Sequence, residues 1–152
     1  MQNSNISRKN ILADKVFIDG DVILDLLLKR EKFYKAAAEL FTLIEQKRIE
    51  GYTSPLIIAN IYYIIARLEN KKIALEKTRL LRSLLKILPL NEKIIDLALL
   101  SPYRDFEESI QYNCASIHNI KIIITRNTKD YPEGEISILE PKDYLFVYKK
   151  SN

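Results

Sequence analysis

Short apolar runs of β-forming residues alternate along this chain with longer segments of helical periodicity. The predicted strands are residues 16–18, 51–54, 87–90, 121–125 and 135–139. Because consecutive parallel strands need a crossover connection, usually an α-helix, this alternation predicts an α/β domain. We expect three layers, α/β/α, around a mostly parallel central sheet.

The predicted helices carry apolar side chains at intervals of three and four. The first of them follows Asp21, and others cover residues 32–47, 55–69, 92–100 and 104–118. A further helix follows the turn at 70–72. In the first helix, Asp25 is expected on the side away from the apolar face. The helix after the turn at 70–72 is predicted to direct Leu80, Leu81, Leu84, Leu85 and Leu88 inward. The helix 104–118 is predicted to bury Phe106, Ile110, Cys114 and Ile117.

The length of 152 residues is typical of one domain, which we place at residues 14–148 after a flexible polar tail over 1–13. No apolar run approaches the ~20 residues that cross a bilayer, which predicts a protein with no membrane segment. The single cysteine favours a reducing compartment, so a cytoplasmic location is expected. The net charge of +4 is compatible with a polyanionic partner but does not identify one.

Polar residues follow three of the predicted strands. Asp19 and Asp21 come after the first strand, Ser54 after the second, and Thr125 and Asn127 end or follow the fourth. Parallel strands end at one edge of the sheet, where ligands bind in open α/β folds. Either aspartate can instead be the N-cap of the helix that begins there, and the residues alone leave both interpretations open.

Two further acids, Asp105 and Glu108, are three residues apart and so lie on one face of the predicted helix 104–118. A solvated helix face, with its N-terminal acid favoured by the helix dipole, explains them equally well.

Four motifs carry a family resemblance. They are an apolar strand followed by Asp-Gly-Asp-Val-Ile-Leu-Asp-Leu-Leu, then Ser-Pro-x4-Asn-Ile-Tyr-Tyr-Ile-Ile, then Asp-Phe-Glu-Glu-Ser-Ile-Gln-Tyr, and finally Ile-Ile-Thr-Arg-Asn-x2-Asp-Tyr. In this order and spacing they resemble a PIN domain, and more closely the bacterial branch that includes VapC-type toxins. The resemblance extends over about residues 15–145.

The resemblance implies a metal-dependent endoribonuclease in which acids at the sheet edge hold Mg²⁺ or Mn²⁺, and the ion activates water for attack on an RNA phosphodiester. By position, Asp19 matches the first acid of the family, with Asp21 beside it, and Glu108 matches the third. Asn60 and Asn127 stand where the family has its second and fourth acids. Thr125 matches a hydroxyl before the fourth position, and Asp105 and Asp130 are additional acids nearby.

The two amides remove two charges from the expected site. We therefore expect one ion held by Asp19 and Glu108, assisted by Asp105 or Asp21, because Mg²⁺ commonly needs only one or two carboxylates. The catalytic set is then Asp19, Asp105 and Glu108, with activity weakened by Asn60 and Asn127.

Basic and aromatic residues supply candidate contacts to RNA. Arg104, Arg126 and Lys129 flank the expected site, and more distant cations at Lys71, Lys72, Arg79 and Arg82 can steer a phosphate backbone. Tyr62, Tyr63, Tyr103 and Tyr131 are candidates for stacking on bases. The resemblance also implies a homodimer, and a cognate antitoxin as protein partner.

Two other functions remain open from the sequence. The apolar strand followed by Asp19-Gly20-Asp21 also fits a phosphohydrolase of the haloacid-dehalogenase type, in which Asp19 attacks phosphate and Asp21 is the acid/base. The amides Asn60 and Asn127 suggest the other alternative, a PIN-like module that has lost catalysis and binds RNA or protein.

Overall fold

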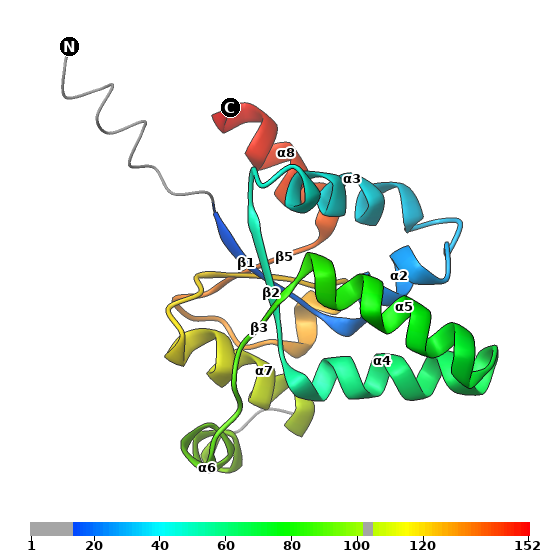
Figure 1. Ribbon diagram of the computed structural model, residues 1–152. Helices are drawn as coiled ribbons and strands as arrows, with labels where there is room; N and C mark the ends of the chain where they lie inside the picture. The colour runs from blue at the N-terminus through cyan, green and yellow to red at the C-terminus, as the bar shows by residue number, and fades with distance from the viewer. Residues whose placement is uncertain (1–13, 102–104) are drawn as a thin grey trace.

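The structure is a computed structural model and describes residues 14–101 and 105–152. Its strands and helices alternate as the sequence predicts, and the three-layer α/β/α architecture is confirmed (Figure 1). The elements are β1 (Lys15–Ile18), α2 (Gly20–Leu27), α3 (Tyr34–Glu45), β2 (Glu50–Thr53), α4 (Pro55–Leu68), α5 (Lys71–Leu84), β3 (Lys86–Ile87), α6 (Glu92–Leu100), α7 (Phe106–Ile117), β4 (Ile122–Ile124), the 3₁₀ turn η1 (Thr128–Asp130), β5 (Ser137–Leu139) and α8 (Pro141–Ser151).

The five strands form one sheet in the order β3-β2-β1-β4-β5, and every neighbouring pair is parallel. The chain runs outward from β1 through β2 to β3, then crosses back to β4 and continues to β5. The strand order therefore reverses between β1 and β4, and the carboxyl ends of these two strands form the crevice that open α/β sheets use for ligands.

The core lies on both faces of the sheet. Val16, Phe17 and Ile18 of β1 are fully buried, as expected for the central strand of a parallel sheet covered on both sides. The helix pair α6 and α7 lies on the opposite side of the sheet from α3 and α8 (Figure 1). In the part of the chain that the structure describes, no helix has both the length and the apolar character needed to span a membrane.

Helix starts follow local sequence signals. Ser54 caps α4 by accepting a hydrogen bond from the backbone N–H of Ile57, and Pro55 occupies the first turn. Asn70 and Asn91 cap α5 and α6 in the same way. Two of the side chains predicted to point inward do not: Leu80 is 53% exposed and Phe106 is 45% exposed. Leu80 points away from the face of α5 that buries Leu81, and Phe106 begins α7, before the helix packs against the core.

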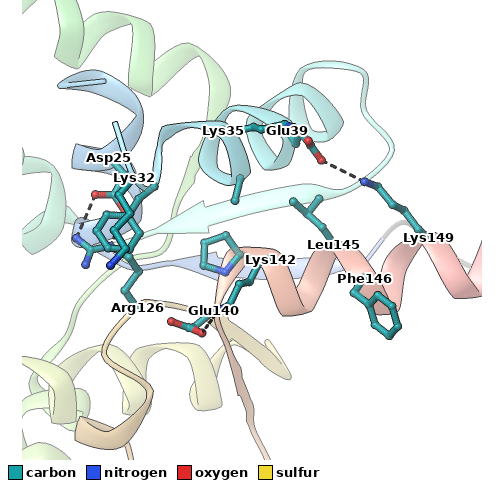
Figure 2. A pocket seen from close by; sticks show the side chains of 13 residues that line it. Asp25, Lys32, Lys35, Glu39, Arg126, Glu140, Lys142, Leu145, Phe146 and Lys149 are labelled. Carbon is teal, nitrogen blue, oxygen red and sulfur yellow. Dashed lines mark hydrogen bonds and ion pairs between the residues drawn. The ribbon is translucent and has the colours of Figure 1, made fainter. Parts of the chain in front are cut away.

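Helices α3 and α8 border a cavity of about 490 Å³ that also receives residues from the segments after β4 and β5 (Figure 2). Its lining includes Phe33, Leu145 and several lysines. An exposed ion pair between Lys149 and Glu39, 3.2 Å apart, crosses between the two helices. One wall of this cavity is formed by Arg126, from the segment that follows β4.

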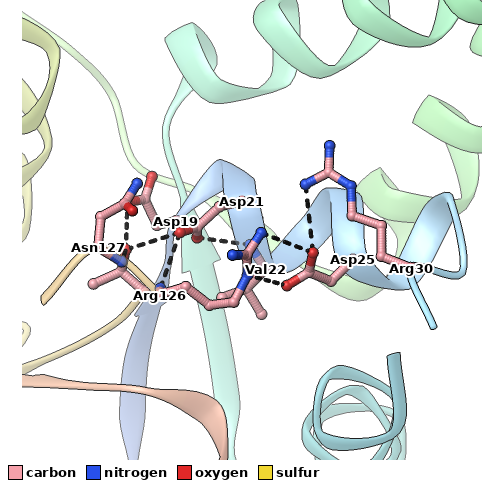
Figure 3. Close-up of polar contacts among 8 residues, drawn as sticks. Asp19, Asp21, Val22, Asp25, Arg30, Arg126 and Asn127 are labelled. Atoms are coloured by element: carbon pink, nitrogen blue, oxygen red, sulfur yellow. Dashed lines mark hydrogen bonds and ion pairs between the residues drawn. The ribbon is translucent and has the colours of Figure 1, made fainter. Parts of the chain in front are cut away.

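Asp25, in α2, is completely buried, although its position relative to the apolar face predicted the opposite. Its carboxylate accepts two hydrogen bonds from Arg126, from Nε at 2.6 Å and from Nη2 at 3.1 Å, and a weaker one from Arg30 at 3.4 Å (Figure 3). The Arg126 guanidinium also lies over the ring of Phe33, 3.9 Å from its centre. These contacts lock the segment after β4 onto α2 and α3.

We expect Arg126→Ala to destabilise the protein by about 3–5 kcal/mol, because it leaves the Asp25 carboxylate buried without its main partner. The measurement is the free energy of unfolding in urea. Lys149→Ala is the matched control: it breaks the exposed pair with Glu39 and should cost less than about 1 kcal/mol. Equal losses of unfolding free energy in the two variants would show that the buried pair stabilises the protein no more than the exposed pair does.

Candidate functional site

The carboxyl ends of β1 and β4 border a cavity of about 420 Å³ that also receives side chains from α2, α4 and α7. One wall is apolar and includes Ile57 and Ile61 of α4. The charged and amide residues that line it are Asp19, Asp21, Arg30, Asn60, Arg67, Glu107, Glu108 and Asn127, and the predicted stacking candidate Tyr63 lines it as well. The predicted residues Asp19, Asp21, Asn60, Glu108 and Asn127 therefore do meet in one place, although they come from four separate parts of the chain.

Asp19 is at the centre of the site and is 7% exposed. Its Oδ1 accepts a hydrogen bond from the N–H of Gly20 at 2.7 Å, and its Oδ2 accepts bonds from the hydroxyls of Thr125 at 2.9 Å and Tyr131 at 3.1 Å. Burial raises the pKa of the Asp19 carboxyl, and these three donors oppose the rise. Asp19 is also the N-cap of α2, so the capping and site interpretations both hold.

Asp21 lies beside Asp19 in the first turn of α2. Its Oδ2 accepts a hydrogen bond from the backbone N–H of Arg126 at 2.9 Å and from the Thr125 hydroxyl at 3.3 Å, while Oδ1 accepts one from the N–H of Val22 (Figure 3). Burial, followed by the negative charge of Asp19, raises the pKa of Asp21 to about 6. The fully buried Thr125 hydroxyl lies between the two aspartates and donates its single proton to one of them at a time, with Asp19 the nearer acceptor.

Glu108 reaches the cavity from α7. Burial, followed by the charges of Asp19, Asp105 and Asp21, raises its pKa to about 8, and hydrogen bonding from Tyr131 opposes that rise. Its Oε2 atom is buried and has no hydrogen-bond partner. A buried carboxyl oxygen without a donor is costly, and either a proton or a cation relieves that cost.

Asp105 lies differently from the predicted arrangement, and Asn60 lines the cavity beside an acid that was not predicted. Asp105 is the N-cap of α7: its side chain is exposed, accepts the N–H of Glu108 at 3.2 Å and does not line the cavity. The neighbouring Glu107 does line it, and Glu107 Oε1 accepts a hydrogen bond from Asn60 Nδ2 at 3.0 Å.

The segment after β4 contributes less to the cavity than predicted. Asn127 lines the cavity, but Lys129 and Asp130 are exposed in η1 and do not. The Arg126 side chain pairs with Asp25 and faces the cavity between α3 and α8, so that only its backbone N–H serves the site (Figures 2 and 3). Arg104 and Tyr103 lie outside the described residues.

Sequence reasoning missed four contributions: Glu107, the two cavity arginines Arg30 and Arg67, and the hydroxyl of Tyr131. Glu107 adjoins the predicted pair of acids, and Arg67 is seven residues, or about two helical turns, after Asn60 on α4. Both signals were available in the spacing. Nothing local indicates that the Tyr131 ring is buried with its hydroxyl on Asp19.

The donor set fits one hydrated hard cation. Across residues 14–101 and 105–152, no three Asp, Glu, His or Cys side chains stand close enough to enclose a metal ion. Asp19 and Glu108 nevertheless share the cavity, each with a pKa raised in part by neighbouring negative charge. Mg²⁺ keeps several waters and binds through one or two carboxylates, so these residues suffice for such an ion.

Comparisons with known proteins agree with this fold. The chain is 25% identical over 137 residues to ribonuclease VapC1 of Aquifex aeolicus. The aligned residues cover 87% of this chain and 94% of that protein. Among solved structures, a toxin-antitoxin complex from Klebsiella pneumoniae matches with a TM-score of 0.63 at 20% identity, covering 83% of this chain and 97% of that one. VapBC2 from Rickettsia felis, bound to a promoter DNA fragment, matches with a TM-score of 0.60 at 16% identity, covering 82% and 96%.

The family profile described as PIN domain matches residues 15–129, which includes every strand but β5 and every polar residue that lines the cavity. The chain therefore belongs to the PIN domain family.

Proposed function

We propose that this protein is a metal-dependent endoribonuclease that hydrolyses RNA phosphodiester bonds in the cavity at the ends of β1 and β4. The observation that carries the proposal is the gathering of Asp19, Asp21 and Glu108 in one cavity, all with raised pKa values. Its full-length similarity to a protein named ribonuclease VapC1 supports RNA as the substrate.

Asp19 and Glu108 would hold a Mg²⁺ or Mn²⁺ ion, with Asp21 beside them and Asp105 acting only through its charge. When bound, such an ion activates water and neutralises the charge that develops on the phosphate. The chain's own residues orient the carboxylates: Thr125 and the Gly20 N–H hold Asp19, and the Arg126 N–H holds Asp21.

The cavity arginines replace the predicted substrate contacts. Arg30 and Arg67 line the cavity, whereas the Arg126 guanidinium is committed to Asp25. An arginine can bind a phosphate through two parallel hydrogen bonds, so Arg67 is our candidate for holding the RNA backbone. The amides Asn60 and Asn127 remain as neutral hydrogen-bonding groups around it.

We also propose an antitoxin protein as a partner, because matching structures include VapBC2 and a toxin-antitoxin complex. A homodimer remains a prediction. The exposed side chains of Tyr63 and Leu68 give α4 apolar surface that a second copy could cover. A cytoplasmic location remains a prediction as well. Membership of the PIN family argues against the phosphohydrolase alternative.

The first test is cleavage of single-stranded RNA with Mn²⁺. We expect Asp19→Asn to reduce the rate by about 100-fold or more, because losing a metal-binding carboxylate costs at least as much as losing a group that orients one. Asp96→Asn, at an exposed position on α6, is the matched control and should leave the rate unchanged. Metal-independent cleavage traces of equal size from wild type and Asp19→Asn would instead support a catalytically impaired binding module.

A second test uses pH in the metal-free protein. Glu108 keeps its proton up to a pKa of about 8 when folded but loses it near its ordinary value of 4.5 when unfolded. The folded state then binds more protons, so the contribution of Glu108 to stability is complete below the unfolded pKa and is lost as pH rises through about 8.

With a chelator present, we therefore expect the urea midpoint of the wild type to fall between about pH 5 and about pH 8.5, relative to that of Glu108→Gln. Adding Mg²⁺ at the upper end should restore the wild type and not the variant. Parallel pH curves for the two proteins would contradict the raised pKa of Glu108.

A further inference from the structure

Tyr131 places a buried hydroxyl directly behind the carboxylates of the site. The residue follows η1 and is 6% exposed, and it is not among the residues that line the cavity. Its hydroxyl donates to Asp19 Oδ2 at 3.1 Å and is also close enough to Glu108 to hydrogen-bond with it. A phenylalanine would fill the same space, so the hydroxyl itself needs an explanation.

The hydroxyl stands between two groups that repel each other. Asp19 comes from the end of β1 and Glu108 from α7, and the charge of Asp19 is the second-largest cause of the raised pKa of Glu108. A phenol has one proton to donate, so it can serve only one of the two carboxylates at a time. Consistent with this limit, Glu108 Oε2 is left without a partner.

The same contact fixes the orientation of Asp19. Oδ2 receives two donors, Thr125 and Tyr131, which occupy both of its lone pairs, whereas Oδ1 receives only the Gly20 N–H. Asp19 therefore keeps an unused lone pair on Oδ1 alone, and Glu108 keeps its unpaired Oε2.

We propose that Tyr131 is a positioning residue whose hydroxyl fixes Asp19 and, lying between Asp19 and Glu108, couples the energies of the two carboxyls in the metal-free protein. This inference rests on the proposed function only for its consequence, namely that the two acids are then arranged to receive a cation. The coupling itself concerns this chain's own side chains.

The coupling is tested in metal-free protein by a double-mutant cycle with Tyr131→Phe and Glu108→Gln. Each variant and the double variant are unfolded in urea with a chelator present, at a pH above the Glu108 pKa of about 8, where this carboxyl is charged. We expect Tyr131→Phe to lower the urea midpoint less in the Glu108→Gln background, because the repulsion that the hydroxyl screens is already gone. Additive shifts in midpoint would overturn the proposal.

The consequence is tested by Mn²⁺ binding, followed by electron paramagnetic resonance. Tyr131→Phe should weaken binding by about 10- to 100-fold, the usual effect of losing a group that orients a metal-binding side chain. At saturating Mn²⁺ the kcat should return to within a few-fold of wild type. Tyr144→Phe is the matched control: Tyr144 is also buried and donates to an aspartate, Asp14 at 2.7 Å, but lies outside the site.

The two tests separate this inference from the proposed function. If the shifts in midpoint are non-additive but the wild type binds no Mn²⁺, the role of Tyr131 stands and the metal proposal is overturned. Unchanged Mn²⁺ affinity in Tyr131→Phe, or an equal loss in Tyr144→Phe, would overturn the positioning role while the nuclease proposal stands.

Discussion

The parallel pairing of β1 with β4 is the constraint on which the site depends. It sets Ile18 opposite Ile124, and the N–H of Asp19 continues the ladder by donating to the carbonyl of Ile124 at 3.0 Å. The first polar residues beyond both strands, Asp19 and Thr125, are therefore adjacent although 106 positions separate them. A shift of one residue in this register would turn one of the two side chains to the other face of the sheet.

Hydrogen-bond donors from rigid elements make this concentration of acids tolerable. Backbone N–H groups at the start of α2 and after β4, together with the Thr125 hydroxyl, bind Asp19 and Asp21. They offset part of the cost of burial, but the pKa values of both aspartates remain raised. The fold thus stores unfavourable electrostatic energy at one edge of the sheet, a pattern typical of functional sites.

Local signals in the sequence were sufficient for the architecture and for part of the site. Strand and helix periods, and caps such as Ser54, are properties of neighbouring residues, so the order of elements was predictable. Asp25 was not, because its partner Arg126 is 101 residues away and only the folded sheet brings them together. Spacing placed Asp105 and Glu108 on one helical face, but could not show that Asp105 precedes α7 as its cap and leaves Glu107 in the cavity.

The pairing of Arg126 with Asp25 also shapes the electric field of the molecule. With that guanidinium neutralised elsewhere, four carboxyl groups and only two arginines line the cavity, whereas the whole chain carries a net charge of +4. A polyanion is attracted from a distance and repelled at short range until positive charge enters the cavity. Under the proposed function, this opposition predicts an order of binding, in which a cation precedes the RNA.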